Sequence, residues 1–167
     1  MKTKINMQSR CRKSLRVKDP RGWTYDSPLE AETAKYLSGL GVVFTGGSCY
    51  RENPNFKTIK YQTKAGDPRF YAPDFMVSPT SSSKVIVEAK GYFDSRTYHH
   101  TKAALSQGYL MGFVFNSERD VVGKPLYPRS NDTVAQWLNK QGIDWVCSPK
   151  EAPNLLARLL AKKGDAA

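Results

Sequence analysis

The segment FYAPDFMV at residues 70–77 and the segment KVIVEAK at residues 84–90 decide the fold. Both are rich in β-branched and aromatic residues, and the Ser- and Pro-containing stretch between them predicts a connecting loop. If the two strands form a hairpin, the numbers of paired residues sum to about 161 or 162, which brings Asp74 beside Glu88. Side chains alternate along a strand, so Glu88 and Lys90 share one face. The hairpin therefore predicts two carboxylates and an amine at one edge of a sheet.

This grouping of charges predicts a metal site. Two neighbouring carboxylates repel each other, and a bound divalent cation removes the repulsion. Carboxylate oxygens favour magnesium, for which we expect manganese to substitute. Such a metal can polarise a phosphate and lower the pKa of a bound water, while the ammonium of Lys90 orients that water or stabilises developing charge. The alternative is a surface hairpin whose Asp, Glu and Lys form a weak ion-pair cluster.

The remaining stretches predict a mixed α/β fold in which helices flank a sheet. Ser27 as N-cap, Pro28 at the first helical position and Glu30 as the partner in a capping box begin a helix that Gly39 and Gly41 end. Further helices are expected at 94–107, at 133–141 and from residue 153 onward. Further strands are expected at 42–45, 57–63, 109–115 and 143–147, with a turn at 64–69.

Length and composition exclude several classes of protein, among them disordered and membrane-spanning ones. The 167 residues suit one domain, and 40% hydrophobic residues argue against wholesale disorder. No apolar run reaches the roughly 18–20 residues needed to cross a bilayer, and the first residues lack the apolar stretch of a secretory signal. Three scattered cysteines suit a reducing compartment, and Gly46-Gly47 lacks the Lys-Ser/Thr of a phosphate-binding loop. We expect a cytoplasmic protein with no membrane partner and no nucleotide cofactor.

The charge is concentrated at the N-terminus. Of the formal net charge of +11, residues 1–25 hold eight basic side chains against one acid, which predicts a flexible basic arm ahead of a folded domain at 26–167. Such an arm is typical of polyanion binders, because each neutralised phosphate releases counterions. The candidate DNA contacts are Arg12, Lys13, Arg16, Lys18 and, on an expected strand, Lys60. The alternatives are a solvated tail and an edge strand protected by its lysines.

Two pairs of residues carry weaker signals. His99 and His100 are adjacent on an expected helix and point about 100° apart, so they cannot both face one metal, and an exposed helical face is favoured. Trp23 and Tyr25 lie beside the basic arm, where they either stack on bases or pack against the body of the protein.

Pro73-Asp74 and Glu88-Ala89-Lys90, with Glu30 on an upstream helix, resemble the PD-(D/E)xK nuclease superfamily. More narrowly, the chain resembles the phage endonuclease I family of Holliday-junction-resolving enzymes. The narrower resemblance rests on stretches in the same order over residues 27–150: SPLE at 27–30, YAPDF at 71–75, VEAKGY at 87–92, FVFNS at 113–117 and WLNKQGI at 137–143.

The resemblance implies a restriction-endonuclease-like fold and a metal-dependent DNA endonuclease. Its substrates would be four-way junctions and other branched DNA, cut by paired nicks that leave 5′-phosphates. Asp74, Glu88 and the carbonyl of Ala89 would bind the metal, Glu30 would complete the site, and Lys90 would serve the attacking water.

The resemblance further implies a domain-swapped homodimer with residues 57–63 as the bridge, so that Glu30 serves either its own site or the partner's. If the chain is phage-encoded, it works in the cytoplasm of the host cell. Two alternatives stay open: another nuclease of the superfamily that cuts ordinary duplex DNA, and a DNA-binding protein that keeps the fold without the chemistry.

Overall fold

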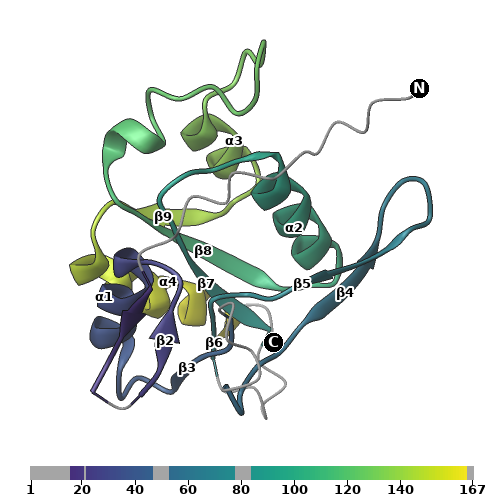
Figure 1. The fold of residues 1–167 in the computed structure, drawn as a ribbon. Helices are drawn as coiled ribbons and strands as arrows, with labels where there is room; N and C mark the ends of the chain where they lie inside the picture. The colour runs from purple at the N-terminus through teal and green to yellow at the C-terminus, as the bar shows by residue number, and fades with distance from the viewer. Residues whose placement is uncertain (1–15, 21, 47–52, 78–83, 165–167) are drawn as a thin grey trace, which may run out of the picture.

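The computed structural model describes residues 16–20, 22–46, 53–77 and 84–164. In these ranges the chain is an α/β protein with a mixed five-stranded sheet and four helices packed against it (Figure 1). The helices are α1 (Pro28–Leu37), α2 (Ser95–Ser106), α3 (Val134–Lys140) and α4 (Ala152–Gly164). The strands of the large sheet are β3 (Val42–Phe44), β6 (Phe75–Val77), β7 (Val85–Lys90), β8 (Leu110–Phe115) and β9 (Asp144–Val146).

Strand β7 lies at the centre of the large sheet, whose order is β3-β6-β7-β8-β9. It pairs antiparallel with β6 and parallel with β8, and α2 makes the crossover between β7 and β8. The register pairs Phe75 with Val87 and Met76 with Ile86, so paired numbers sum to 162 and the hairpin register is confirmed. Every residue of β7 before Lys90 is buried, as expected for a strand covered on both faces.

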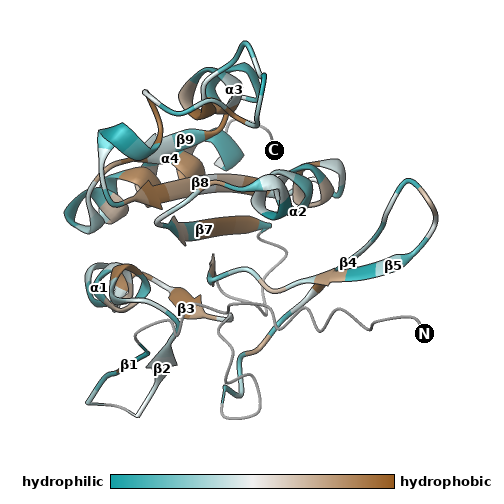
Figure 2. Cartoon of the chain, turned by 45° about the horizontal axis from the view of Figure 1, so that its top comes forward, coloured by the Kyte–Doolittle hydropathy of each residue, from teal (hydrophilic) through white to brown (hydrophobic). Residues whose placement is uncertain are grey.

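The two faces of the sheet bury two separate apolar clusters. Phe75, Val85 and Val87 pack with leucines of α1 and α4 on one face. Met76 and Ile86 pack with residues of α2 and α3 on the other. Figure 2 shows β7 as a strongly apolar strand, with α1 on one side of it and α2 on the other. The alternation of side chains along β6 and β7 therefore supplies both cores, and Asp74 and Glu88 lie where the pattern reaches the end of the β6–β7 pair.

The strand expected at 70–77 is two strands in two different sheets, and this expectation is wrong as a continuous element. Strand β5 (Pro68–Tyr71) pairs with β4 (Ile59–Gln62) in a separate two-stranded ribbon, and β6 begins only at Phe75. Pro73 lies in the break, where its missing N–H cannot donate to a ladder. The chain thus changes sheets at residues 72–74, and Asp74 stands at the point of change.

Regular structure begins within the segment expected to be a flexible arm. Strands β1 (Val17–Lys18) and β2 (Thr24–Tyr25) form an antiparallel pair within the segment expected to lack regular structure. Tyr25 is 1% exposed, and its ring lies 4.6 Å from that of Phe44, centroid to centroid. Trp23 is half-buried and packs against the same cluster, so both aromatic residues pack against the body of the protein.

The other expected elements are found with ends displaced by one or two residues. Ser27 caps α1 by accepting from the Glu30 N–H, and Asp94 caps α2 in the same way through Thr97. The final helix is longer than expected and reaches Gly164. Among the residues described, no helix is long and apolar enough to span a membrane.

Candidate active site

Asp74 and Glu88 face each other across the end of the β6–β7 hairpin. The Asp74 backbone N–H donates to Glu88 Oε1 at 3.0 Å, and the Ala89 N–H donates to Asp74 Oδ2 at 2.9 Å. Both carboxylates are buried, with residue exposures of 6% and 1%. Each carboxylate is therefore held by a peptide N–H of the opposite strand, and their separation is set by the register of the sheet.

Lys90 joins the two carboxylates. Its Nζ lies 2.7 Å from Glu88 Oε2 and 3.3 Å from Asp74 Oδ2, and its side chain is 27% exposed. Burial on its own would lower the pKa of Lys90, but the negative charges of Asp74 and Glu88 outweigh it and raise that pKa above its ordinary value. Lys90 is thus a positive charge at neutral pH, placed where both carboxylates converge.

This donor set fits a divalent cation. Burial, and then the charge of Glu88, raise the pKa of Asp74 well above its usual range, and the positive charge of Lys90 offsets this only in part. Glu88 Oε2 is buried, and its contact with the described residues is the ion pair with Lys90 Nζ at 2.7 Å. Two oxygens that converge on one ammonium are equally placed to converge on a hard cation.

Glu30 lies near this pair but does not join it. Burial raises the pKa of Glu30, and Lys90 and Asp74 both interact with it electrostatically. Its oxygens accept from the Asp26 N–H at 3.0 Å and the Ser27 hydroxyl at 3.1 Å. Within the described ranges, no three His, Cys, Asp or Glu side chains form a group that could hold a metal ion. Glu30 in this chain closes the start of α1, bonding the Asp26 N–H rather than that of the N-cap Ser27 expected for a capping box.

Tyr71 is a site residue that the sequence did not reveal. Its hydroxyl donates to Glu88 Oε1, and burial, followed by the charge of Glu88, raises the pKa of the phenol well above its usual range. The ring of His100 stacks on the Tyr71 ring at 4.6 Å between centroids. Burial lowers the pKa of His100, which keeps the imidazole neutral. Tyr71 therefore remains a proton donor that orients Glu88, and His100 packs behind it, while His99 is exposed as expected.

A second supporting contact comes from the loop after β3. The Thr45 N–H donates to the Asp74 carbonyl at 2.8 Å, and the Thr45 hydroxyl donates to the Pro73 carbonyl at 3.0 Å. Buried Asn53 donates to the carbonyls of Phe44 and Gly46 and so fixes this loop in turn. The backbone around Asp74 is thereby held from the side opposite β7.

The candidate DNA contacts are distributed over the surface. Arg16 and Lys18, beside and in β1, are exposed, and so is Lys60 in β4, whereas Arg12 and Lys13 lie outside the described residues. The Arg16 guanidinium lies 4.0 Å from Asp26, the residue whose N–H bonds Glu30. Arg16 is therefore linked through Asp26 to Glu30.

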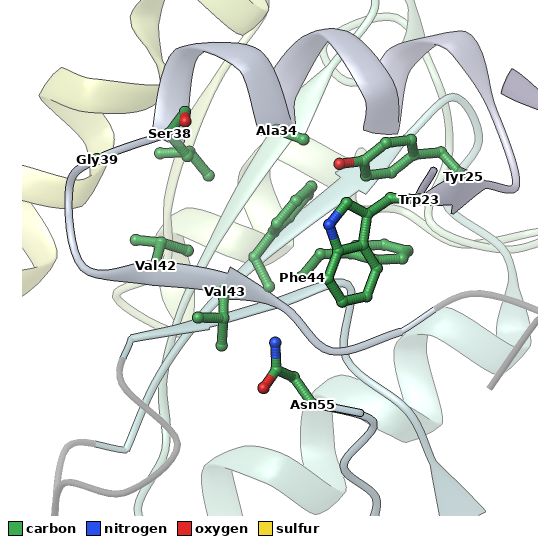
Figure 3. Close-up of a pocket in the computed structure, with 11 residues that line it drawn as sticks. Trp23, Tyr25, Ala34, Ser38, Gly39, Val42, Val43, Phe44 and Asn55 are labelled. Atoms are coloured by element: carbon green, nitrogen blue, oxygen red, sulfur yellow. The ribbon is translucent and has the colours of Figure 1, made fainter. Parts of the chain in front are cut away.

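A cavity of about 140 Å³ lies apart from the carboxylates. Figure 3 shows the rings of Trp23, Tyr25 and Phe44 gathered below α1, where they line the cavity together with apolar residues and the polar Ser38 and Asn55. None of Asp74, Glu88 and Lys90 lines this space. We assign it to the packing of the β1–β2 pair against the body rather than to the chemistry of the site.

Comparison with known proteins adds no family assignment: neither the models of protein families nor the curated proteins include a match to this chain.

A substitution at Gly46 tests how closely the loop after β3 packs against the backbone of Asp74. A Cβ at this position would lie 2.6 Å from the Pro73 carbonyl oxygen and 3.1 Å from Asp74 Cα, both backbone atoms that cannot move without displacing the site. We expect Gly46→Ala to lower the free energy of unfolding by about 1–3 kcal/mol, as overpacking does. Urea denaturation measures the change. Gly123→Ala is the matched control, because its Cβ would meet only the Arg119 carbonyl at 3.7 Å; equal effects of the two substitutions would contradict the close contact.

The raised pKa of Asp74 makes stability depend on pH. The folded state holds this proton more tightly than the unfolded state, so the stability present at low pH is lost as the pH rises through the folded-state pKa. Asp74→Asn removes that loss, and we expect the variant to gain stability relative to the wild type as the pH rises from 4 to 8, by on the order of 1 kcal/mol. Urea midpoints at each pH measure it. Asp67→Asn, which changes an exposed carboxylate, is the control. If Asp74→Asn instead loses stability relative to the wild type as the pH rises, the raised pKa of Asp74 is refuted.

Proposed function

We propose that this chain is a metal-dependent DNA endonuclease that resolves four-way junctions and other branched DNA by paired nicks, leaving 5′-phosphates. The observation that carries the proposal is the pair of buried carboxylates, Asp74 and Glu88, that converge on the ammonium of Lys90 at the end of a strand hairpin. Buried like charges are costly unless they serve chemistry, and perturbed pKa values cluster at functional sites. The mixed sheet, in which β7 is antiparallel to β6 and parallel to β8, is consistent with a restriction-endonuclease-like fold.

The metal is proposed to be magnesium, with manganese able to substitute. Asp74 and Glu88 would hold it, together with the carbonyl of Ala89, whose N–H already bonds Asp74. When bound, the ion would polarise the scissile phosphate and lower the pKa of a water molecule. Glu30 is proposed as an outer member of the site, because it interacts electrostatically with Asp74 and Lys90 from the same chain.

The side chains of the protein would then do three things. Asp74 and Glu88 keep the negative charge that holds the cation, Tyr71 fixes the orientation of Glu88, and Lys90 contributes a positive charge beside the reacting phosphate. Hydrolysis adds the water oxygen to phosphorus and breaks the bond to the 3′ oxygen. The products are a 3′-hydroxyl and a 5′-phosphate.

The preference for branched DNA and the homodimer are proposed on the resemblance to the phage endonuclease I family. Two cuts in opposing strands of a junction require two sites, which a homodimer supplies. In the single chain β4, the proposed bridge, pairs with β5, so an exchange between subunits would carry one or both of these strands. The exposed Arg16 and Lys18, with Arg12 and Lys13 ahead of them, are proposed to bind the phosphates of the junction arms.

Lys90 provides the direct test of catalysis. We expect the wild-type chain to nick a four-way junction in magnesium and not in EDTA, and Lys90→Ala to lower the rate by at least 100-fold, since a charge that stabilises a transition state is removed. Junction binding in EDTA should change less than threefold. Asp74→Asn should abolish nicking equally, and its urea midpoint at the pH of the assay shows whether the inactive variant is folded. Nicking that survives both substitutions would overturn the site.

The substrate comparison separates the rival functions. The wild-type chain is incubated in magnesium with the four-way junction and, separately, with a linear duplex that has the sequence of two joined arms of that junction. Equal rates on the two would favour a nuclease of ordinary duplex DNA. No magnesium-dependent cleavage of either, with binding intact, would favour a DNA-binding protein that keeps the fold without the chemistry.

Tyr71 tests the geometry of the metal ligand. Tyr71→Phe removes the hydroxyl that orients Glu88, and loss of such an outer-shell partner costs about 10- to 100-fold in metal affinity. Manganese binding followed by calorimetry measures this without any turnover, and the magnesium concentration for half-maximal nicking should rise in parallel. Tyr109→Phe is the control, because Tyr109 precedes β8 at the opposite end of the β7–β8 pair. Unchanged manganese affinity in Tyr71→Phe would contradict the positioning role.

A further inference from the structure

The β4–β5 ribbon has one face directed at the body and one directed away from it. Ile59 and Tyr71 pair with each other and are buried in the core, and Tyr61 packs against the same cluster. On the opposite face Lys60 is paired with Phe70, and both are exposed. Figures 1 and 2 show the ribbon projecting beyond the sheet and helices. The outward face is defined here as Lys60, Gln62, Pro68 and Phe70, all of them exposed.

The exposure of Phe70 on this face needs an explanation. Phe70 is 59% exposed, although burying such a ring is worth about 1.5–3 kcal/mol. The Lys60 ammonium lies 6.0 Å from the centre of the Phe70 ring. An aromatic ring with a cation beside it is the arrangement with which proteins bind single-stranded nucleic acid, where the ring stacks on a base and the cation meets the backbone.

The charge around the ring favours a polyanion. Residues 57–70 contain three lysines and one arginine against a single acid, Asp67. Lys57, Lys64 and Arg69 are all exposed. The ribbon therefore combines a stacking surface with positive charge along its length, which an apolar protein partner would not need.

The ribbon is anchored firmly enough to position what it binds. Gln107, at the end of α2, donates its side-chain N–H to the Lys60 carbonyl at 2.9 Å. Tyr71 follows Phe70 directly and donates to Glu88. Phe70 and Asp74 are four residues apart, so their Cα atoms are separated by at most roughly 14 Å. A base stacked on Phe70 would therefore place its own strand within reach of the carboxylates.

We propose that the outward face of the β4–β5 ribbon binds an unstacked base of DNA through Phe70, with Lys60 on the adjacent phosphate, and so directs branched DNA to the site. The direction of DNA to a catalytic site rests on the proposed nuclease function, but the binding of a base by Phe70 does not. A base at a branch point and a base in single-stranded DNA have the same exposed face, whereas a continuous duplex offers none except at its ends.

The test measures binding by fluorescence anisotropy in EDTA, where no cleavage occurs, with the full chain. The probes are a four-way junction, a single-stranded oligonucleotide and a duplex closed by hairpins at both ends. We expect Phe70→Ala to weaken binding to the junction and the single strand about tenfold or more, and binding to the closed duplex by less than twofold. Phe70→Trp, which keeps a flat aromatic ring, should bind the junction and the single strand as tightly as the wild type does. Phe70→Leu, which keeps apolar volume without a flat ring, should bind them as weakly as Phe70→Ala does. Lys60→Ala should make the slope of log K against log[salt] less steep by about 0.9, which corresponds to the loss of one phosphate contact.

Two controls keep the result specific. Tyr127 is an exposed aromatic residue outside the ribbon, at 52% exposure, and Tyr127→Ala should leave all three affinities unchanged. Thermal melting and sedimentation of each variant show whether its fold and its oligomeric state are those of the wild type.

Several results would overturn the proposal. These are an unchanged affinity of Phe70→Ala, an equal loss on the closed duplex, full rescue by Phe70→Leu, or a change in oligomeric state, which would assign the ring to a contact between subunits. Failure of the nuclease proposal is distinguishable, since a wild-type chain that never nicks in magnesium would still show, or fail to show, the binding differences in EDTA.

Discussion

Two carboxylates buried side by side are the constraint on which the structure depends. An unpaired buried charge costs several kcal/mol, so Asp74 and Glu88 are tolerable only with hydrogen bonds and a neighbouring cation in fixed positions. The sheet supplies the first through the peptide N–H groups of Asp74 and Ala89, and Lys90 supplies the second. A slip of β6 against β7 by one residue would turn Asp74 toward the opposite apolar core and separate it from Glu88. The hairpin register is thus fixed by its polar end as well as by its apolar residues.

The rest of the fold can be understood as support for that arrangement. The chain leaves the β4–β5 ribbon, crosses the break at Pro73 and enters the large sheet, which presents Tyr71 and Asp74 to Glu88 from one short segment. The loop after β3 holds the same segment from the other side through Thr45, and its close approach leaves no room for a side chain at Gly46. Ribbon, sheet and loop therefore meet at one point, so a change in any of them is transmitted to the carboxylates.

The parts of this arrangement that follow from local patterns could be predicted from the sequence. Alternation along two neighbouring strands was enough to place Asp74 beside Glu88, because both strands are short and antiparallel. Tyr71 was missed for a physical reason: in one continuous strand over 70–77 it would lie on the face opposite Asp74, and only the break at Pro73 turns its hydroxyl toward Glu88. The β1–β2 pair was missed because strands of two residues carry no periodicity. The contacts of Thr45 and Asn53 join positions distant in sequence to backbone carbonyls, which leave no mark on residue type.

The electrostatics of the site decide between two roles for Lys90. A lysine acts as a general base only where burial or neighbouring positive charge lowers its pKa toward neutrality. Here the two carboxylates outweigh burial and raise the pKa of Lys90, so the amine holds its proton firmly. A cation between Asp74 and Glu88 would offset those charges in part and weaken the hold of both carboxylates on the ammonium. With a cation there, Lys90 would have donors for a phosphate oxygen or a water, and its raised pKa favours a role as a positive charge and hydrogen-bond donor over the removal of a proton. The same side chain keeps both carboxylates paired in the chain alone, which accounts for the burial of so concentrated a negative charge.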